Sequence, residues 1–267
     1  MLSISRRKFT QSLTALAASH CALAQLAFAQ TQDSAGGVKP RRIDVHHHIL
    51  PPEYVATVGE KAIGAPAPNR EIPKWDVSKS IEAMDRNGIT SAVVSVSAPG
   101  VLLDDPGKTS RLARACNQFA AQMVADHPAR YGMFASLPMP DTRASLLELN
   151  YALDVLHAEG IVLMTNYRDR YLGDPDFAPI FDEMNRRKAV VYVHPTTCGC
   201  NVEVLPDNPA ALIEFPHDST RTITSLLFSG TYSRCPDIRF IFSHAGGTLP
   251  FLADRIARIA SQDRRLA

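Results

Sequence analysis

The sequence lacks several features that would decide the class of the protein at once. Its most apolar stretch, Leu13–Ala29, is interrupted by Ser19, His20 and Gln25 and is too weak and short for a membrane-spanning helix. The 28 basic and 27 acidic residues are nearly balanced, and neither half is strongly basic, so nucleic acid is not an expected partner. No Gly-x-Gly-x-x-Gly follows the first apolar run, which removes the main sign of a dinucleotide-binding fold.

The N-terminus carries an export pattern instead. Ser5-Arg6-Arg7-Lys8-Phe9 is a twin-arginine motif, and Ala27-Phe28-Ala29 is a small-x-small cleavage site. We therefore expect a signal peptide at residues 1–29, periplasmic localisation and no membrane association after cleavage. An ordinary secretory signal is the alternative for the motif, and a cytoplasmic protein is the alternative for the location. Residues 30–42 are predicted to be a linker.

Cysteine is scarce, and its spacing suggests no disulfide framework of the small secreted type. Four of the five cysteines lie beyond the predicted signal: Cys116, Cys198, Cys200 and Cys235. Cys198-Gly199-Cys200 directly follows a histidine-containing segment, so it is either a metal-binding pair or a simple loop. The periplasm permits disulfides, and the oxidation state of this pair stays open.

From Ile43 onward, short apolar runs alternate with amphipathic helical stretches. The predicted strands, rich in β-branched residues, are 43–48, 90–97, 131–137, 160–166, 189–194 and 238–243. The predicted helices are 76–87, 109–127, 141–158, 175–187, 209–229 and 248–262. Such βα alternation predicts a parallel α/β sheet, either doubly wound or closed into a barrel.

Histidines near the C-terminal end of the first strand favour the barrel, whose chemistry lies on that rim. The fold class expected is therefore the (β/α)8 TIM-barrel type. Residues 43–267 supply only six βα units, however, so the barrel is expected to be truncated after six units, a C-terminally incomplete domain.

The first strand contains Asp44-Val45-His46-His47-His48. Residues two apart in a strand share a face, so His46 and His48 should lie side by side while His47 points away. Two neutral imidazoles on one face suit a divalent transition metal. The alternative is a polar turn that is rich in histidine.

Two later strands also end in histidine. His194 closes the run Val190-Val191-Tyr192-Val193, and His244 follows Ile241-Phe242-Ser243. Three of six strands thus finish in histidine, although the whole chain has only nine. A metal site on the catalytic rim explains this clustering better than core histidines satisfied by backbone hydrogen bonds.

These motifs together resemble a known family. Asp-Val-His-x-His-x-x-Pro, Val-His-Pro and Ser-His-Ala-Gly-Gly-Thr-Leu-Pro-Phe are similar to the metal-dependent decarboxylase branch of the amidohydrolase superfamily, over about residues 42–260. That branch includes aminocarboxymuconate-semialdehyde decarboxylase and the resorcylate and methylsalicylate decarboxylases. The resemblance implies a non-oxidative carboxy-lyase acting on a small aromatic or enol-type carboxylic acid.

The resemblance also implies roles for the four histidines. His46, His48 and His194 match the ligands of a single Zn²⁺, with Mn²⁺ as a possible substitute. His244 matches a catalytic histidine that acts in proton transfer beside the metal.

Two arginines match substrate-binding residues of the same branch. Arg255 corresponds to an arginine that binds the substrate carboxylate, in some members across a dimer interface, so a homodimer is expected. Arg70, which precedes Trp75, corresponds to a second carboxylate-binding arginine. The alternative for both is an ordinary exposed charge.

Two absences bear on the function that the resemblance implies. The predicted fourth strand, 160–166, has no lysine of the kind that bridges two metals in binuclear members of the superfamily, so the site should be mononuclear. This favours the decarboxylase branch without excluding a hydrolase. The family's Gly-Ser/Thr-Asp-Tyr/Phe-Pro motif, which supplies one more ligand, does not occur. The alternatives are a mononuclear hydrolase of a lactone, amide or ester, and a catalytically impaired fragment that binds metal weakly.

Overall fold

The computed structural model describes residues 41–64, 75–198 and 209–262. The predicted signal peptide, most of the predicted linker, Arg70 and Cys200 lie outside these ranges. The chain divides into Met1–Arg41 and Arg42–Ala267, and the architecture below is that of the second unit. No helix in the described part of the chain is long and apolar enough to cross a bilayer.

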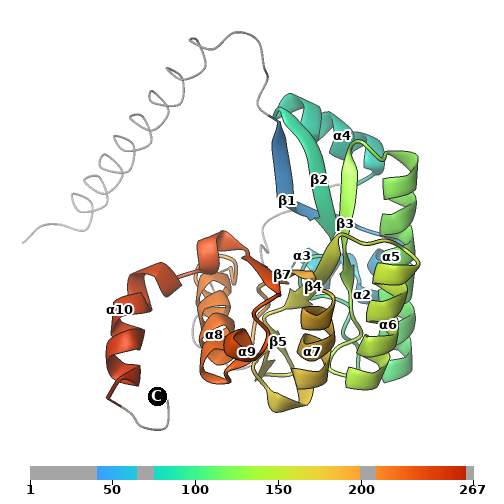
Figure 1. Ribbon diagram of the computed structural model, residues 1–267. Helices are drawn as coiled ribbons and strands as arrows, with labels where there is room; N and C mark the ends of the chain where they lie inside the picture. Colours follow the sequence, from blue (N-terminus) through green and yellow to red (C-terminus); the bar gives the residue numbers. More distant parts are fainter. Residues whose placement is uncertain (1–40, 65–74, 199–208, 263–267) are drawn as a thin grey trace, which may run out of the picture. The chain divides into compact units, whose positions relative to one another are not determined.

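A six-stranded sheet forms the centre of this unit, with every neighbouring pair parallel (Figure 1). Its strands, in spatial order, are β1 (Arg42–His48), β2 (Ile89–Ser95), β3 (Tyr131–Ser136), β4 (Gly160–Met164), β7 (Val190–His194) and β8 (Arg239–Phe242). The six predicted strands are confirmed to within one or two residues at each end. The central strands β3, β4 and β7 are largely buried, as continuous apolar runs in a parallel sheet predict. Strand β1 begins at Arg42, one residue before the predicted strand.

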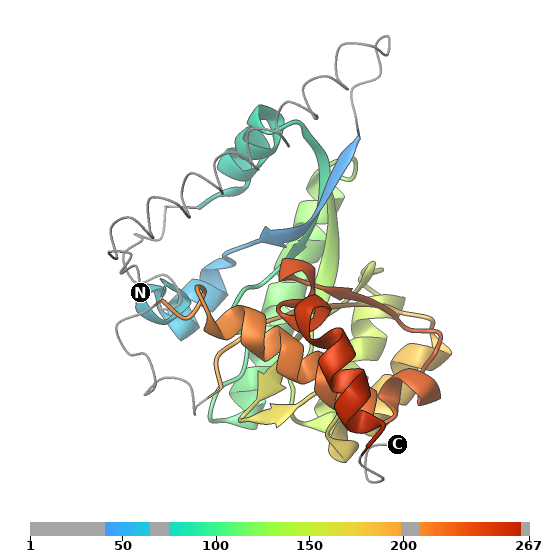
Figure 2. The same cartoon turned by 90° about the vertical axis from the view of Figure 1, so that its left-hand side faces the viewer.

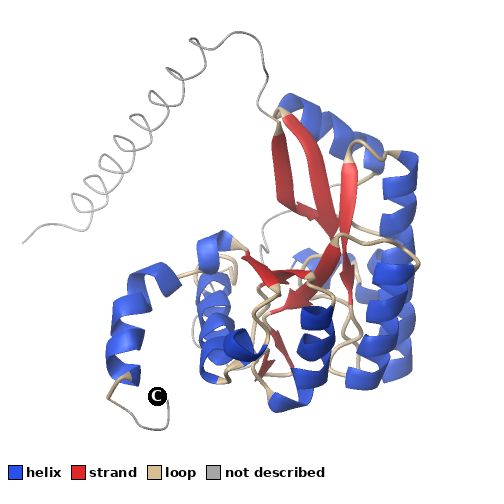
Figure 3. Ribbon diagram, viewed as in Figure 1, coloured by secondary structure: helices blue, strands red, loops and turns tan. Residues whose placement is uncertain are grey.

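The longer helices alternate with the strands along the chain, and some of them pack against the sheet (Figures 1 and 3). The longer ones are α4 (Val77–Arg86), α5 (Pro106–Asp126), α6 (Thr142–Asp154), α7 (Ala178–Arg186), α8 (Glu214–Phe228) and α10 (Leu249–Ala260). Asp141 caps α6 by accepting a hydrogen bond from the Ala144 amide, and Asp174 caps the 3₁₀ turn η1 (Pro175–Phe177) before α7. Polar residues at these positions therefore fix where the helices begin.

Several short elements were not predicted. They are α2 (Pro52–Val58), α3 (Glu60–Gly64), the antiparallel pair β5 (Asn166–Tyr167) and β6 (Arg170–Tyr171), α9 (Thr231–Arg234) and the 3₁₀ turn η3 (His244–Gly246). Elements of two to seven residues contain too few periods for a hydrophobic pattern to be read. Tertiary packing holds them: Tyr54 on α2 is fully buried, and its hydroxyl donates to the Ser97 carbonyl at 3.0 Å.

The described residues thus form six of the eight βα units of a (β/α)8 barrel, with β1 and β8 as the two edge strands (Figure 2). Parallel strands place all their C-terminal ends on one rim, where β1 and β7 end in histidine. The last helix, α10, has no buried residue, and Phe251 on it is 91% exposed. Helix α10 therefore exposes large apolar side chains, Phe251 and Ile259.

Candidate metal centre

The β1 histidines lie as the strand pleat predicts. The rings of His46 and His48 are 4.8 Å apart, whereas His47 points to the opposite face. There, the His47 ring is within hydrogen-bonding distance of Asp44 (3.1 Å) and of the Ser80 hydroxyl on α4 (2.7 Å). Asp44 also accepts a hydrogen bond from the His46 amide at 2.9 Å. The strand is therefore held from its helix side while its inner face presents two imidazoles.

His194, the last residue of β7, completes the group. It is only 2% exposed, and its ring centroid lies 4.8 Å from that of His48 and 5.1 Å from that of His46. Its Nδ1 is 2.8 Å from the carbonyl oxygen of Pro195. Because this contact requires a proton on Nδ1, it leaves Nε2 of His194 as a free lone pair.

The three histidines fit a divalent transition metal. Each offers one nitrogen, and these nitrogens all lie within 4.8 Å of one another. Nδ1 of His48 is buried without a hydrogen-bond partner, a state that buried polar atoms rarely keep. Three imidazoles with an open fourth position are the donor set of a catalytic rather than a structural metal site.

The structure does not support Cys198 as part of a metal-binding pair with Cys200. Across residues 41–64, 75–198 and 209–262, the three histidines are the group able to hold a metal. Cys198 is buried and disulfide-bonded, so its sulfur is not a thiolate ligand. Cys116 and Cys235 are free and buried.

His244 lies beside this group on the loop after β8. Its ring centroid is 5.1 Å from that of His46, and Phe215 on α8 stacks against it at 6.4 Å. His244 and Ala245 both have positive φ, an uncommon backbone state for residues other than glycine. Gly247 also has positive φ and abuts the Pro216 carbonyl so closely that no Cβ would fit. Such strain at a loop that carries a histidine is typical of functional sites.

All four imidazoles are held neutral by their surroundings. Burial, and then the neighbouring His46, lowers the pKa of His48 from 6.5 to about 4. Burial followed by His48 lowers the pKa of His194 well below its usual value, and burial followed by His244 lowers that of His46. Burial also lowers the pKa of His244. Neutral imidazole is the form that binds a metal, so the group is ready to bind at neutral pH.

These shifts predict a pH dependence of stability in the metal-free protein. In the unfolded chain His48 is protonated below about pH 6.5, whereas in the folded protein it is protonated only below about pH 4. The free energy of unfolding should therefore be level above pH 6.5 and fall by about 3 kcal/mol from this residue as the pH drops to 4. Urea unfolding in EDTA would measure it. The His48→Asn variant should lose this part of the slope; an unchanged slope would contradict the assignment.

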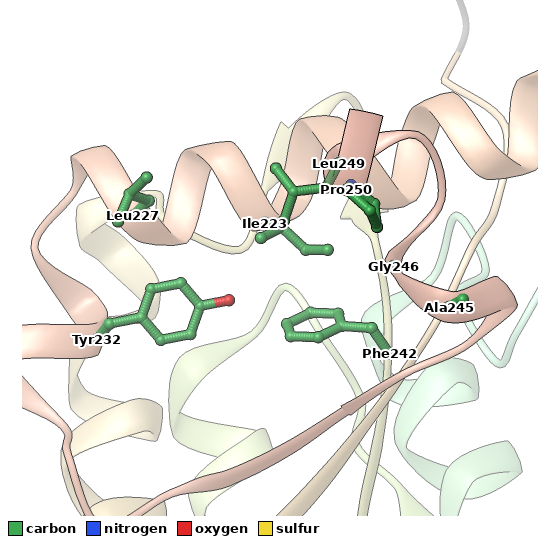
Figure 4. A pocket seen from close by; sticks show the side chains of 8 residues that line it. All are labelled: Ile223, Leu227, Tyr232, Phe242, Ala245, Gly246, Leu249 and Pro250. Carbon is green, nitrogen blue, oxygen red and sulfur yellow. The ribbon is translucent and has the colours of Figure 1, made fainter. Parts of the chain in front are cut away.

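The pocket in Figure 4 is separate from the histidine group. It has a volume of about 540 Å³ and is lined by apolar residues of α8, α9, β8 and the start of α10, among them Ile223, Tyr232, Phe242 and Leu249. None of the four histidines lines it. It lies on the helix side of β8, since Phe240, two residues before Phe242, packs against Phe181 of α7. It is a gap between helices rather than part of the metal centre.

The structure shows no contact between the predicted substrate-binding arginines and the histidines in the part of the chain that it describes. Arg255 is an exposed residue of α10, where it borders a small apolar hollow of about 210 Å³ with Phe228 and Ile259. Within the described ranges, no hydrogen bond or ion pair connects it to a histidine of its own chain. Arg70 lies outside these ranges. Both roles stay predictions.

One buried residue near the site was missed by sequence reasoning. Asp218 on α8 is fully buried and binds side chains at the end of β4. The available signal was weak: Asp218 lies in the polar run 217–222 of the predicted helix, and nothing in that run marks it as buried. A buried acid needs partners, but the sequence does not say which ones.

The fold and the site together define a class: a (β/α)8-type barrel protein with a cluster of histidines at its strand ends that could hold a metal. The amidohydrolase family model matches residues 43–265 of this chain. The chain therefore belongs to the amidohydrolase family.

The most similar relatives include two fungal decarboxylases. The decarboxylase yanB of Aspergillus niger is 44% identical over 229 residues, which cover 82% of this chain and 62% of that protein. The 6-methylsalicylic acid decarboxylase acuB of Aspergillus aculeatus is 41% identical over 220 residues, covering 81% and 66%. The chain spans about two thirds of the length of these relatives.

Solved structures show the same fold. A crystal structure of an amidohydrolase II superposes with a TM-score of 0.76 at 31% identity, covering 83% of this chain and 72% of that one. A dihydroxybenzoic acid decarboxylase from Polaromonas sp. JS666, with bound manganese and the inhibitor 2-nitroresorcinol, superposes with a TM-score of 0.68 at 22% identity, covering 80% and 68%.

Proposed function

We propose that this chain is a metal-dependent, non-oxidative decarboxylase of a small aromatic or enol-type carboxylic acid. The observation that carries the proposal is the convergence of three neutral imidazoles with a fourth histidine 5.1 Å from the nearest of them. The similarity to 6-methylsalicylic acid decarboxylase supports a hydroxybenzoate-like substrate.

Decarboxylation breaks the bond between the ring carbon and the carboxylate, releases CO₂ and leaves an electron pair on the carbon, which must take up a proton. His46, His48 and His194 would hold the metal, which supplies a Lewis acid for a substrate oxygen. His244 is partly open to solvent and is oriented by Phe215, so it can carry a proton to that carbon.

For the metal itself we propose Zn²⁺, with Mn²⁺ as the alternative. Three nitrogen ligands suit zinc, whereas the manganese bound by the Polaromonas decarboxylase favours the second ion. Metal-free protein reconstituted with each ion separately, and assayed for bound metal and turnover, would decide between them.

For the assembly we propose a homodimer in which Arg255 binds the substrate carboxylate in the neighbouring copy. The exposure of Arg255, and of Phe251 beside it, supports a helix that contacts a partner. Light scattering would give the oligomeric state. Mixing Arg255→Ala with His48→Ala chains should restore activity that neither has alone; no restoration would contradict a shared site.

For Arg70, we expect the alanine variant to raise KM.

A hydrolase is the second candidate, because an open three-histidine site can also activate water. A panel of hydroxybenzoates, lactones, amides and esters separates the two functions. We expect CO₂ release from a hydroxybenzoate such as 6-methylsalicylic acid, abolished by EDTA and restored by metal. Lactone opening or ester cleavage without CO₂ release would instead establish the hydrolase.

For the location we propose the periplasm, reached by twin-arginine export. The support is the motif Ser5-Arg6-Arg7-Lys8-Phe9 with its cleavage site. A reporter fused to residues 1–35 should be exported, and replacing Arg6 and Arg7 by lysine should stop it. Export that survives this change would indicate an ordinary secretory signal.

A further inference from the structure

A buried carboxylate lies behind the metal centre. Asp218 on α8 is 0% exposed and accepts hydrogen bonds from three side chains of the β4–β6 segment. The Thr165 hydroxyl and the Asn166 amide (2.9 Å) donate to Oδ2, and the Tyr171 hydroxyl donates to Oδ1 at 2.7 Å. Its nearest cation, Arg221, is 3.7 Å away and 42% exposed. A buried acid with this many partners requires an explanation, because burying charge is costly.

Thr165 connects this carboxylate to His194. The Thr165 amide donates to the His194 carbonyl at 2.9 Å, and its hydroxyl oxygen accepts from the Thr196 amide at 3.0 Å. Thr165 therefore holds the chain on both sides of Pro195. The Pro195 carbonyl in turn lies 2.8 Å from Nδ1 of His194 and sets the tautomer of that ring.

The chemistry of these contacts requires a carboxylate. Because the Thr165 hydroxyl donates its hydrogen bond to Asp218, the lone pairs of its oxygen remain free to accept a hydrogen bond from the Thr196 amide. Asn166 and Tyr171 also donate, so Asp218 is the acceptor in all three of these hydrogen bonds. An asparagine at this position would turn its NH₂ group toward at least one donor. The same helix carries Phe215, whose ring lies 6.0 Å from that of His194.

We propose that Asp218 is a positioning residue, which acts through Thr165 and the Pro195 carbonyl to hold the His194 imidazole in its metal-binding tautomer and orientation. The proposal deepens the proposed metal centre and rests on it for its role in function. The positioning itself can also be measured without metal.

The experiment compares wild type with Asp218→Asn and Thr165→Val, using the full chain. In EDTA, NMR of ¹⁵N-labelled histidine should show His194 (assigned with a His194→Gln variant) as one Nδ1–H tautomer in wild type and as a mixture in both variants. With Co²⁺ as the probe, both variants should bind 10- to 100-fold more weakly. Their visible d–d bands should also shift.

The matched control is Glu148→Gln on α6. Glu148 is also a buried carboxylate, 4% exposed, and binds Arg114 and Asn117 but no histidine. The Glu148→Gln variant should lower the stability of the protein without changing the His194 signal or the Co²⁺ bands. If Asp218→Asn only lowers the melting temperature and leaves both signals as in wild type, the proposal is overturned. If that variant does not fold, Thr165→Val decides alone, because it keeps the carboxylate and its other two partners.

The two arms separate the inference from the metal proposal. If the wild-type chain binds no Co²⁺ but its His194 tautomer still depends on Asp218, the metal site is refuted and the positioning role of Asp218 is supported. If the wild-type chain binds Co²⁺ and its His194 tautomer does not depend on Asp218, the metal site is supported and the positioning role is refuted.

Discussion

Replacing His48 by alanine should reduce the affinity for Co²⁺ or Zn²⁺ by more than about 100-fold, a larger loss than an outer-shell change produces. The reason is that His48 supplies one of the three nitrogens that converge within 4.8 Å in the described part of the chain. Its alanine variant would retain two, and two ligands leave a metal largely hydrated. Competition with a chromophoric chelator measures this affinity directly and needs no substrate.

His47 provides the matched control for that measurement. It is the adjacent residue in the same strand, yet its ring points to α4 and pairs with Asp44 and Ser80. His47→Ala should cost about 1 kcal/mol of stability through the lost hydrogen bonds and leave the metal affinity unchanged. Equal losses in both variants would show that damage to β1, rather than a missing ligand, causes the effect.

Replacing His244 by asparagine should lower kcat by about 10²- to 10⁴-fold, the range typical for loss of a general acid or base. Metal content should stay at the wild-type level, because His244 is not one of the three converging ligands. Steady-state kinetics together with metal analysis of the same sample would show both results. The substrate should still bind, so KM should change far less than kcat.

The control for this second change is His157→Asn, at an exposed histidine with a similarly positive φ. It should leave both kcat and metal content as they are. Loss of metal in His244→Asn would make His244 a ligand. Undiminished turnover would remove it from the proton-transfer step.

The strand framework could be predicted largely because the central strands β3, β4 and β7 are buried and therefore consist of continuous apolar runs. The pleat of β1 likewise placed His46 and His48 together, because the period of two is a local property. Their approach to His194 followed from the rule that parallel strands share a C-terminal rim. The convergence of these three histidines was therefore accessible from the sequence.

Other parts of the site depend on contacts that no local pattern encodes. His244 reaches the group through positive-φ residues and through Gly247 packed against α8. Asp218 meets Thr165 across 53 residues of sequence. The β5–β6 pair, two residues per strand, is too short to give a period. Tertiary packing decides such features, and only the structure shows them.

We propose that His46, His48 and His194 hold one divalent metal, and anomalous diffraction can locate that metal. Crystals soaked in Zn²⁺ or Mn²⁺ would be measured on both sides of the metal absorption edge. We expect a single strong peak about 2 Å from one nitrogen of each of the three histidines. No peak between these rings, or a peak at another group, would contradict it.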